Sequence, residues 1–346
     1  MRPAIRAENP LEWLLLRLGL LPTPLLDGYW GMATSRALLT AIELGLFDVL
    51  RERPMTAVEL AERLGTDLSG TEVLLGALNG MRYVRRRAGR YSNGREVTRW
   101  LSESGTLDLR ESVLFFGDLW DVVSDLTGLV RSGNAGNLHY DGRGPDFWRR
   151  YLRGLGVFVP LAAPEIVRKA RLPRGARRLL DVGGGHGLYA AGFVRRTPGL
   201  SAEVFDLPEA CAVGREMVAE SGVAEGVTFR EGDARSEPWG EGFDAVLLFN
   251  LVHNLTPEES ADAFRRAHAA LRPGGVVVVL EGEHQGAEGD ISITAGLNEM
   301  LFFLTSGTRV YPEATMRDWM SDAGFSGIRT RHLISMPMMV LITATR

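Results

Sequence analysis

Nine residues determine how the second half of this chain folds: Leu179-Leu180-Asp181-Val182-Gly183-Gly184-Gly185-His186-Gly187. An apolar run ends in a carboxylate and a glycine cluster, and an amphipathic run follows over residues 188–194. This order is typical of a buried strand, a tight turn and a helix. Glycines in such a turn let backbone N–H groups approach a ligand, and the N-terminus of the next helix adds a positive dipole end. The stretch therefore predicts a site for a small polar ligand.

The composition restricts the class of protein. With 346 residues the chain is long enough for two domains, and its net charge of −4 gives no general attraction to nucleic acid. Cys211 is the only cysteine and the histidines lack ligand-like spacing, so we expect neither disulfides nor a metal site. The apolar run over residues 11–21 is too short to span a bilayer. We expect a cytoplasmic protein that does not bind membranes.

Residues 1–105 have the pattern of a winged-helix domain. Apolar residues recur at helical spacing from 29 to 50, Thr56 and Glu59 form a capping box, and a further helix is expected over 70–81. A β-hairpin with five arginines follows, namely Arg82, Arg85, Arg86, Arg87 and Arg90. Such a hairpin either reads DNA, as in a winged-helix regulator with a degenerate ligand domain, or is a solvated turn on a domain used for subunit contact. Because the chain is acidic overall, we favour subunit contact and expect no nucleic-acid partner.

The remainder of the chain divides into two further regions. Residues 106–172 are expected to be a helical linker whose aromatic side chains, together with residues 298–303, build a substrate pocket. In residues 173–346, seven short strands alternate with helices, at 179–182, 202–205, 227–230, 245–249, 276–280, 328–331 and 339–343. This alternation predicts an α/β domain with a doubly wound, mostly parallel sheet.

Polar residues follow the expected strands, at the ends where ligands bind in such sheets. They are Asp181, Asp206, Asp233, residues 250–253 and Glu281. Asp206 lies about twenty residues beyond the glycine turn, where an acidic side chain binds ribose hydroxyls, so the ligand is expected to be a nucleoside. Residues 185–190 also fit the dinucleotide pattern G-x-G-x-x-A, which is weak on its own. Asp233 is placed to meet an adenine amino group, and no nicotinamide-side signature appears.

The strand ends carry five motifs in order: Leu180-Asp181-Val182-Gly183-Gly184-Gly185-His186-Gly187, Phe205-Asp206-Leu207-Pro208, Gly232-Asp233, Asn250-Leu251-Val252-His253-Asn254 and Pro273-Gly274-Gly275. In these motifs, and over nearly the whole chain, the sequence closely resembles the class I small-molecule O-methyltransferases that depend on S-adenosylmethionine. The resemblance implies a Rossmann-like seven-stranded catalytic domain, an N-terminal winged-helix dimerisation domain and a homodimer. It also implies S-adenosylmethionine as the cofactor, bound by Asp181, Gly183, Gly185, Asp206, Leu207, Gly232, Asp233, Ala234 and Asn250.

The same resemblance implies roles for individual residues. Gly183 and Gly185 would line the methionine end of the cofactor, Asp206 would hold the ribose, and Asp233 with Ala234 would meet the adenine.

For the transfer step, the resemblance implies that His253 is the general base. It would take the proton of a hydroxyl on a small aromatic or polyketide-like substrate, and Glu281 matches an acid that orients this histidine. A phenol with a pKa of about 10 is a weak nucleophile at neutral pH, which suits an imidazole base.

Two departures from the family pattern leave alternatives open. His253-Asn254-Leu255 stands where the family commonly has His-Asp-Trp, and Thr315 stands at a usual acidic position, with Glu313 two residues earlier. The base is therefore oriented either by Glu281 alone or by Glu313 through a shifted helix start. The rival function is a protein of the same fold that methylates nitrogen or carbon, or that uses the cofactor for chemistry other than methylation.

Overall fold

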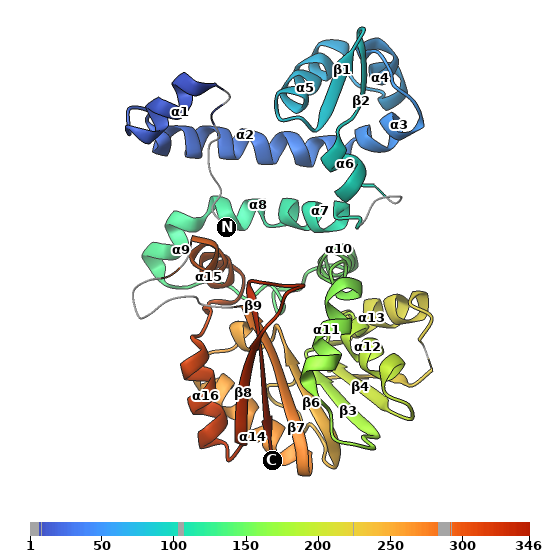
Figure 1. Ribbon diagram of the computed structural model, residues 1–346, viewed down its shortest axis with the longest axis vertical. Helices are drawn as coiled ribbons and strands as arrows, with labels where there is room; N and C mark the ends of the chain where they lie inside the picture. Colours follow the sequence, from blue (N-terminus) through green and yellow to red (C-terminus); the bar gives the residue numbers. More distant parts are fainter. Residues whose placement is uncertain (1–6, 8, 103–106, 224, 283–290, 292) are drawn as a thin grey trace. The chain divides into compact units, whose positions relative to one another are not determined.

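The structure, a computed structural model, describes residues 7, 9–102, 107–223, 225–282, 291 and 293–346. The chain forms two compact units, residues 1–117 and 118–346 (Figure 1). We expected boundaries at 105/106 and 172/173. The observed division instead groups the helices between residues 118 and 172 with the sheet.

The first unit is mainly helical. It contains α1 (Pro10–Arg17), α2 (Thr23–Glu43), α3 (Leu46–Glu52), α4 (Ala57–Leu64), α5 (Leu68–Gly80), β1 (Val84–Arg87), β2 (Arg90–Asn93), α6 (Arg95–Trp100) and most of α7 (Arg110–Asp118). The expected capping box is present, because Thr56 Oγ1 accepts from the Glu59 N–H at 3.2 Å and Glu59 accepts from the Thr56 N–H at 2.7 Å. The apolar run over 29–50 forms two helices rather than one, since Gly45 adopts a φ of +69°.

The β-hairpin of the first unit confirms the predicted position, with β1 and β2 antiparallel. Two of its arginines contact other residues of this unit. Arg90 pairs with Glu59 at 2.9 Å, and the Arg86 guanidinium lies 5.7 Å from the centre of the Tyr91 ring.

The second unit is built on the predicted seven-stranded sheet. Its strands are β3 (Arg178–Val182), β4 (Ser201–Asp206), β5 (Val227–Glu231), β6 (Phe243–Phe249), β7 (Leu271–Gly282), β8 (Ser326–His332) and β9 (Met339–Thr345). The order is β5-β4-β3-β6-β7-β9-β8. The first five strands in this order are parallel, and β9 is antiparallel to both β7 and β8. The mostly parallel, doubly wound sheet is therefore confirmed.

Helices cover both faces of this sheet, α11 and α12 on one side and α14 and α16 on the other. The helices of this unit are α8 (Trp120–Ser124), α9 (Leu126–Ser132), α10 (Pro145–Gly156), α11 (Val159–Ala170), α12 (Leu188–Arg196), α13 (Pro208–Glu220), the 3₁₀ turn η1 (Val252–Asn254), α14 (Pro257–Ala270), α15 (Ile293–Ser306) and α16 (Glu313–Asp322). No helix in the described ranges is long and apolar enough to cross a membrane.

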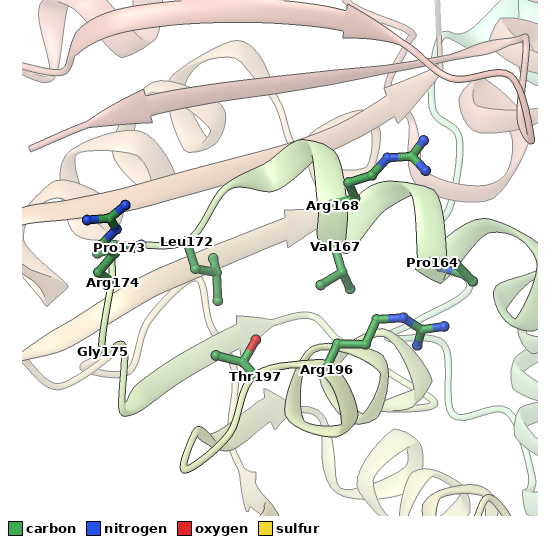
Figure 2. Close-up of a pocket in the computed structure, with 9 residues that line it drawn as sticks. All are labelled: Pro164, Val167, Arg168, Leu172, Pro173, Arg174, Gly175, Arg196 and Thr197. Carbon is green, nitrogen blue, oxygen red and sulfur yellow. The ribbon is translucent and has the colours of Figure 1, made fainter.

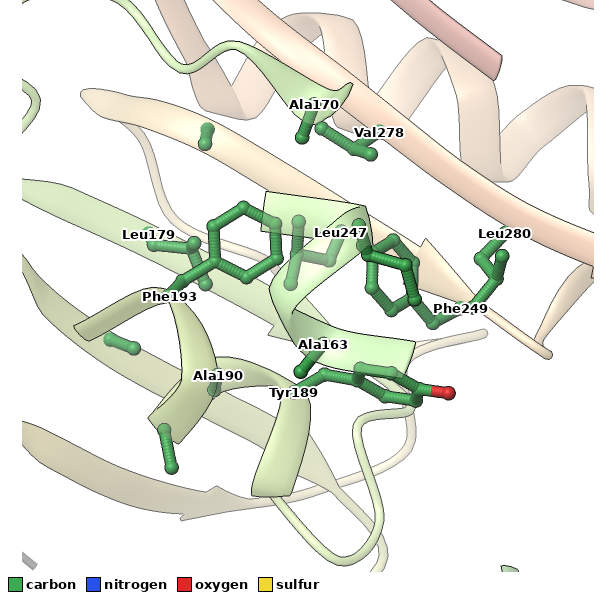
Figure 3. Packing of buried hydrophobic residues seen from close by; sticks show 14 of the residues in the cluster. Ala163, Ala170, Leu179, Tyr189, Ala190, Phe193, Leu247, Phe249, Val278 and Leu280 are labelled. Atoms are coloured by element: carbon green, nitrogen blue, oxygen red, sulfur yellow. The ribbon is translucent and has the colours of Figure 1, made fainter. Parts of the chain in front are cut away.

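The central strand β6 explains why its sequence is apolar without alternation. Leu247 and Phe249 face α11 and α12, where Phe193 packs against them (Figure 3). Val246 and Leu248 face α14 and α16 on the other side. Both faces of β6 are buried, so every position is apolar, as is typical of a parallel sheet covered on both sides. The two cores fix the strand ends on which the candidate site is built.

Candidate active site

The glycine turn after β3 surrounds a buried carboxyl group. Asp181 is 1% exposed, and neither of its oxygens makes a hydrogen bond of standard geometry with a described residue. A Cβ on Gly184 would lie 2.5 Å from the Asp181 Cγ, so this turn fits around the carboxyl only because it lacks side chains. Burial raises the pKa of Asp181 to about 8; the charge of Asp206 adds to the increase and the Ala190 N–H opposes it.

Asp206, the last residue of β4, connects two strand ends. One of its oxygens accepts from the Gly185 N–H and the other from the Leu207 N–H, each at 2.7 Å. Burial raises the pKa of Asp206 to about 6, although these two hydrogen bonds favour the charged form. Each carboxylate oxygen has a second lone pair, so Asp206 can still accept from two ligand hydroxyls.

Asp233, after β5, is held by an arginine. Arg235 donates to it from the backbone at 2.9 Å and from its guanidinium, with Nη2 at 2.9 Å, and the Tyr140 hydroxyl donates at 3.2 Å. Burial raises the pKa of Asp233, but the hydrogen bonds from Arg235 outweigh it and hold the pKa below its usual value. The Arg235 guanidinium also lies 3.6 Å from the centre of the Tyr140 ring.

Gly232 and Ala234, on either side of this aspartate, make hydrogen bonds through their backbone groups. The Gly232 N–H donates to the Asp206 carbonyl at 2.9 Å, which ties the ends of β4 and β5 together. The Ala234 carbonyl accepts from the Trp239 indole at 2.8 Å.

His253, in η1 after β6, forms a buried pair with Glu281 of β7. His253 Nδ1 lies 2.6 Å from Glu281 Oε2, and Glu281 Oε1 accepts from the Val252 N–H at 2.7 Å. The two residues are 8% and 3% exposed. An ionised carboxylate only accepts hydrogen bonds, so the proton of the neutral ring is on Nδ1 and the lone pair is on Nε2. The pair therefore fixes the tautomer of the imidazole and leaves Nε2 as a hydrogen-bond acceptor.

The turn that carries His253 is held by Asn250 and Asn254 of its own motif, and by Ser306 and Thr308, which the sequence did not single out. Asn250 adopts a φ of +52°, and its carbonyl accepts from Asn254 Nδ2 at 3.1 Å. Ser306 donates to Asn254 Oδ1 at 2.7 Å, and the Thr308 hydroxyl donates to the His253 carbonyl. The Phe302 ring stacks on the imidazole, with ring centres 3.9 Å apart. Only Phe302 lies in a segment, 298–303, that we expected at the pocket.

Glu313, the alternative acid considered for orienting His253, contacts other residues. It begins α16, and its carboxylate accepts from the Thr330 hydroxyl of β8 at 2.5 Å and lies 3.7 Å from Arg317. The helix starts at Glu313, so this side chain faces the edge strand β8. The structure therefore gives Glu313 other partners, and the carboxylate in contact with His253 is that of Glu281.

A hollow lies away from these residues. It has a volume of about 570 Å³ and is lined by Arg168, Arg174 and Arg196 among others (Figure 2). Arg174 and Gly175 precede β3, and Thr197 precedes β4, so this hollow lies toward the amino ends of the strands. Its position separates it from the carboxyl ends, where Asp181, Asp206 and His253 are found.

The strand-end residues fit the expected cofactor. S-adenosylmethionine is a nucleoside with a ribose diol and two cationic groups. The buried carboxylate of Asp181 has no standard hydrogen-bond partner among the described residues and suits a cation, while Asp206 retains acceptor capacity for the diol. Within the described ranges, no three His, Cys, Asp or Glu residues are grouped closely enough to hold a metal ion.

Comparisons with known proteins agree with this arrangement. An O-methyltransferase domain matches residues 117–326, and an O-methyltransferase dimerisation domain matches residues 26–104. The 3-hydroxy-5-methyl-1-naphthoate 3-O-methyltransferase of Streptomyces sahachiroi is 31% identical over 328 residues, which cover 89% of this chain and 91% of the relative. The L-tyrosine C(3)-methyltransferase of Streptomyces lavendulae is 26% identical over 319 residues, covering 86% and 85%.

A solved structure extends the comparison. PigF with SAH superimposes with a TM-score of 0.84 at 25% identity, covering 94% of this chain and all of PigF (100%). Fold, site and comparisons together define the class: the protein is an S-adenosylmethionine-dependent methyltransferase. More particularly, the chain belongs to the O-methyltransferase family, with its catalytic domain in the second unit and a dimerisation domain in the first.

Proposed function

We propose that this enzyme methylates a hydroxyl group of a small aromatic or polyketide-like molecule, with His253 as the general base. The observation that carries the proposal is the buried 2.6 Å contact between His253 Nδ1 and Glu281. This contact directs the Nε2 lone pair away from the carboxylate. The stacked Phe302 ring holds the imidazole on one face. Relatives that act on a hydroxynaphthoate and on a tetracenomycin polyketide support the substrate class.

The chain's own residues would carry out the following steps. His253 Nε2 accepts the proton of the substrate hydroxyl as its oxygen attacks, and Glu281 stabilises the imidazolium that forms. S-adenosylmethionine, when bound, supplies an electrophilic methyl group on sulfur. The new O–C bond forms as the C–S bond breaks, and the electron pair of that bond remains on the sulfur. Because His253 and Phe302 fix one face of the pocket, the hydroxyl is held in line for attack.

For the cofactor, we propose the roles that the strand ends support. Asp206 accepts from the two ribose hydroxyls, while Asp181, Gly183 and Gly185 surround the methionine end. On the adenine side, the proposed contacts are Asp233 and Ala234, with Leu207, Gly232 and Asn250 completing the pocket. Asp233 would accept a hydrogen bond from the adenine amino group while Arg235 also donates to its carboxylate, because two carboxylate oxygens accept up to about four hydrogen bonds.

Product analysis tests the proposed reaction. Purified protein is incubated with S-adenosylmethionine and 2,3-dihydroxynaphthalene, and the product is separated and examined by mass spectrometry and NMR. Transfer to oxygen gives a gain of about 14 Da and a methoxy signal, because one hydrogen is replaced by methyl. A relative that methylates carbon makes the C-methyl product the second candidate, and a ring-methyl signal would replace the proposal with it.

We also propose that the protein is a homodimer formed through its first unit. Large apolar side chains on α1, α2 and the residue after α1 are exposed in the single chain, including Trp13, Leu18, Leu25, Tyr29 and Trp30. Such a surface is unusual on a monomer and suits a second copy, in agreement with the dimerisation domain. Light scattering should give twice the chain mass of 38.0 kDa, and a mass of one chain would contradict the proposal.

A further inference from the structure

Asn250, which follows β6 and leads into η1, has an uncommon backbone conformation. Its φ of +52° is one that a residue other than glycine rarely adopts, and its N–H donates to the Leu280 carbonyl of β7 at 2.8 Å. Such a conformation persists only where the surrounding structure fixes it. The contacts that fix Asn250 therefore also determine where the turn places His253.

Asn254, the last residue of η1, uses both ends of its side-chain amide. Its Nδ2 donates to the Asn250 carbonyl at 3.1 Å, and its Oδ1 accepts from the Ser306 hydroxyl at 2.7 Å. The first contact closes the turn on itself, and the second ties the turn to α15. An ionised carboxylate could make only the second contact, because it has no proton to donate. This double role distinguishes Asn254 from the aspartate that commonly follows the histidine in the family.

One face of α15 meets the turn at this point. Phe302 and Ser306 are four residues apart, so they lie on the same side of the helix. The Phe302 ring stacks on the His253 imidazole, with ring centres 3.9 Å apart and an interplanar angle of 18°. Just beyond the helix end, the Thr308 hydroxyl donates to the His253 carbonyl. The hydrogen bond from Ser306 to Asn254 therefore belongs to a set of contacts that dock η1 on α15.

The position of η1 decides whether the imidazole meets its carboxylate. Glu281 contacts two residues of the turn, namely His253 through Nδ1 at 2.6 Å and Val252 through its N–H at 2.7 Å, and all three residues are buried. Because a hydrogen bond weakens steeply as its angle closes below the preferred range, a small rotation of the turn would weaken both contacts. A support that prevents this rotation therefore also preserves the contact between the imidazole and Glu281.

We propose that Asn254 is a positioning residue for methyl transfer: by joining Asn250 to Ser306, it holds η1 where the His253 imidazole meets Glu281. This inference rests on the proposed function of His253 as the general base and deepens it. A base acts only within hydrogen-bond reach of the proton that it removes, so a small displacement of the turn lowers the rate. Asn254 thus acts through its neighbour and has no contact of its own with the reacting atoms.

A double-mutant cycle tests the inference. Single-turnover rates of methyl transfer to 2-naphthol are measured at pH 7 on the full-length protein saturated with S-adenosylmethionine. Asn254→Asp should lower the rate roughly 10-fold in the wild-type background and less than about 2-fold in His253→Ala, because without the base there is nothing left to position. The Kd of S-adenosylhomocysteine should stay within about 2-fold of the wild-type value. Asn134→Asp, the same change at an exposed asparagine, is the matched control and should alter neither quantity.

Proton exchange provides a second measurement that needs no substrate. The Nδ1–H proton between His253 and Glu281 is followed by NMR and identified by its loss in His253→Ala. In Asn254→Asp this proton should exchange with water roughly 10-fold faster than in wild type. Ser306→Ala removes only one hydroxyl group and should accelerate exchange in the same direction, by roughly 3-fold. Ser321→Ala, an exposed serine of α16, should leave the exchange rate unchanged.

The outcomes separate the inference from the proposed function. Equal rate losses from Asn254→Asp in the two backgrounds, or wild-type exchange rates in both Asn254→Asp and Ser306→Ala, would overturn the inference. A His253→Ala rate equal to that of wild type would instead refute the proposed function. The exchange measurement would then still decide whether Asn254 fixes the imidazole, because it does not depend on turnover.

Discussion

The two sides of the site are built in different ways. On the proposed cofactor side, strand ends present Asp181, Asp206 and Asp233, and the glycine turn contacts the first two of them. On the acceptor side, α15 and the residues after it bring Phe302, Ser306 and Thr308 to the turn that carries His253. The first arrangement follows from the topology of the sheet, whereas the second depends on how side chains pack. Changes on the two sides should therefore separate cofactor affinity from turnover.

The largest effect is expected on the acceptor side, from Glu281→Gln. An amide cannot accept from both His253 Nδ1–H and the Val252 N–H, so the histidine tautomer is no longer fixed. We expect kcat to fall roughly 100-fold and the Kd of S-adenosylhomocysteine to change little. Steady-state kinetics and calorimetry check this, with Glu258→Gln, an exposed acid, as the control. A large loss of cofactor affinity with kcat retained would contradict the proposal, because it would mean that Glu281 acts in cofactor binding and not in turnover.

The next effect is on the cofactor side, from Asp206→Ala. Loss of a charged acceptor for the ribose hydroxyls should raise the Kd of S-adenosylhomocysteine roughly 10- to 100-fold. Once the variant is saturated with S-adenosylmethionine, most of kcat should remain. Glu209→Ala, an exposed acid three residues along the chain, is the control. An unchanged Kd in Asp206→Ala would remove this residue from the ribose site.

The smallest effect is on folding stability, and it comes from the ionisation of Asp181. Its folded pKa of about 8 lies above the usual aspartate value of 3.8, so the folded state binds more protons than the unfolded state between these values. Stability therefore falls as pH rises from about 4 to about 8. Asp181→Asn removes this ionisation, so its Tm relative to wild type should be higher by a few degrees at pH 8 than at pH 5. Thermal unfolding without cofactor measures both, and an equal difference at the two pH values would contradict the assignment.

The same contrast explains how much could be predicted from the sequence. The sheet, its order of elements and the positions of Asp206 and Glu281 follow from apolar runs that end in polar residues. The orientation of Glu313 could not be predicted, because one residue of difference in the start of α16 rotates the side chain to another neighbour. The stacking of Phe302 on His253 and the hydrogen bond from Ser306 to Asn254 join segments far apart in the chain, and no spacing rule relates them.

The central claim is that His253 removes the substrate proton. Its most direct test is the single-turnover rate of methyl transfer to 2-naphthol, measured for wild type and His253→Ala from pH 6 to pH 10. We predict a wild-type rate at least about 100-fold higher at pH 6–7, and a ratio that shrinks toward pH 10, where an aromatic hydroxyl ionises without a base. A ratio near one at pH 7, or one that stays constant over the whole range, would contradict the account.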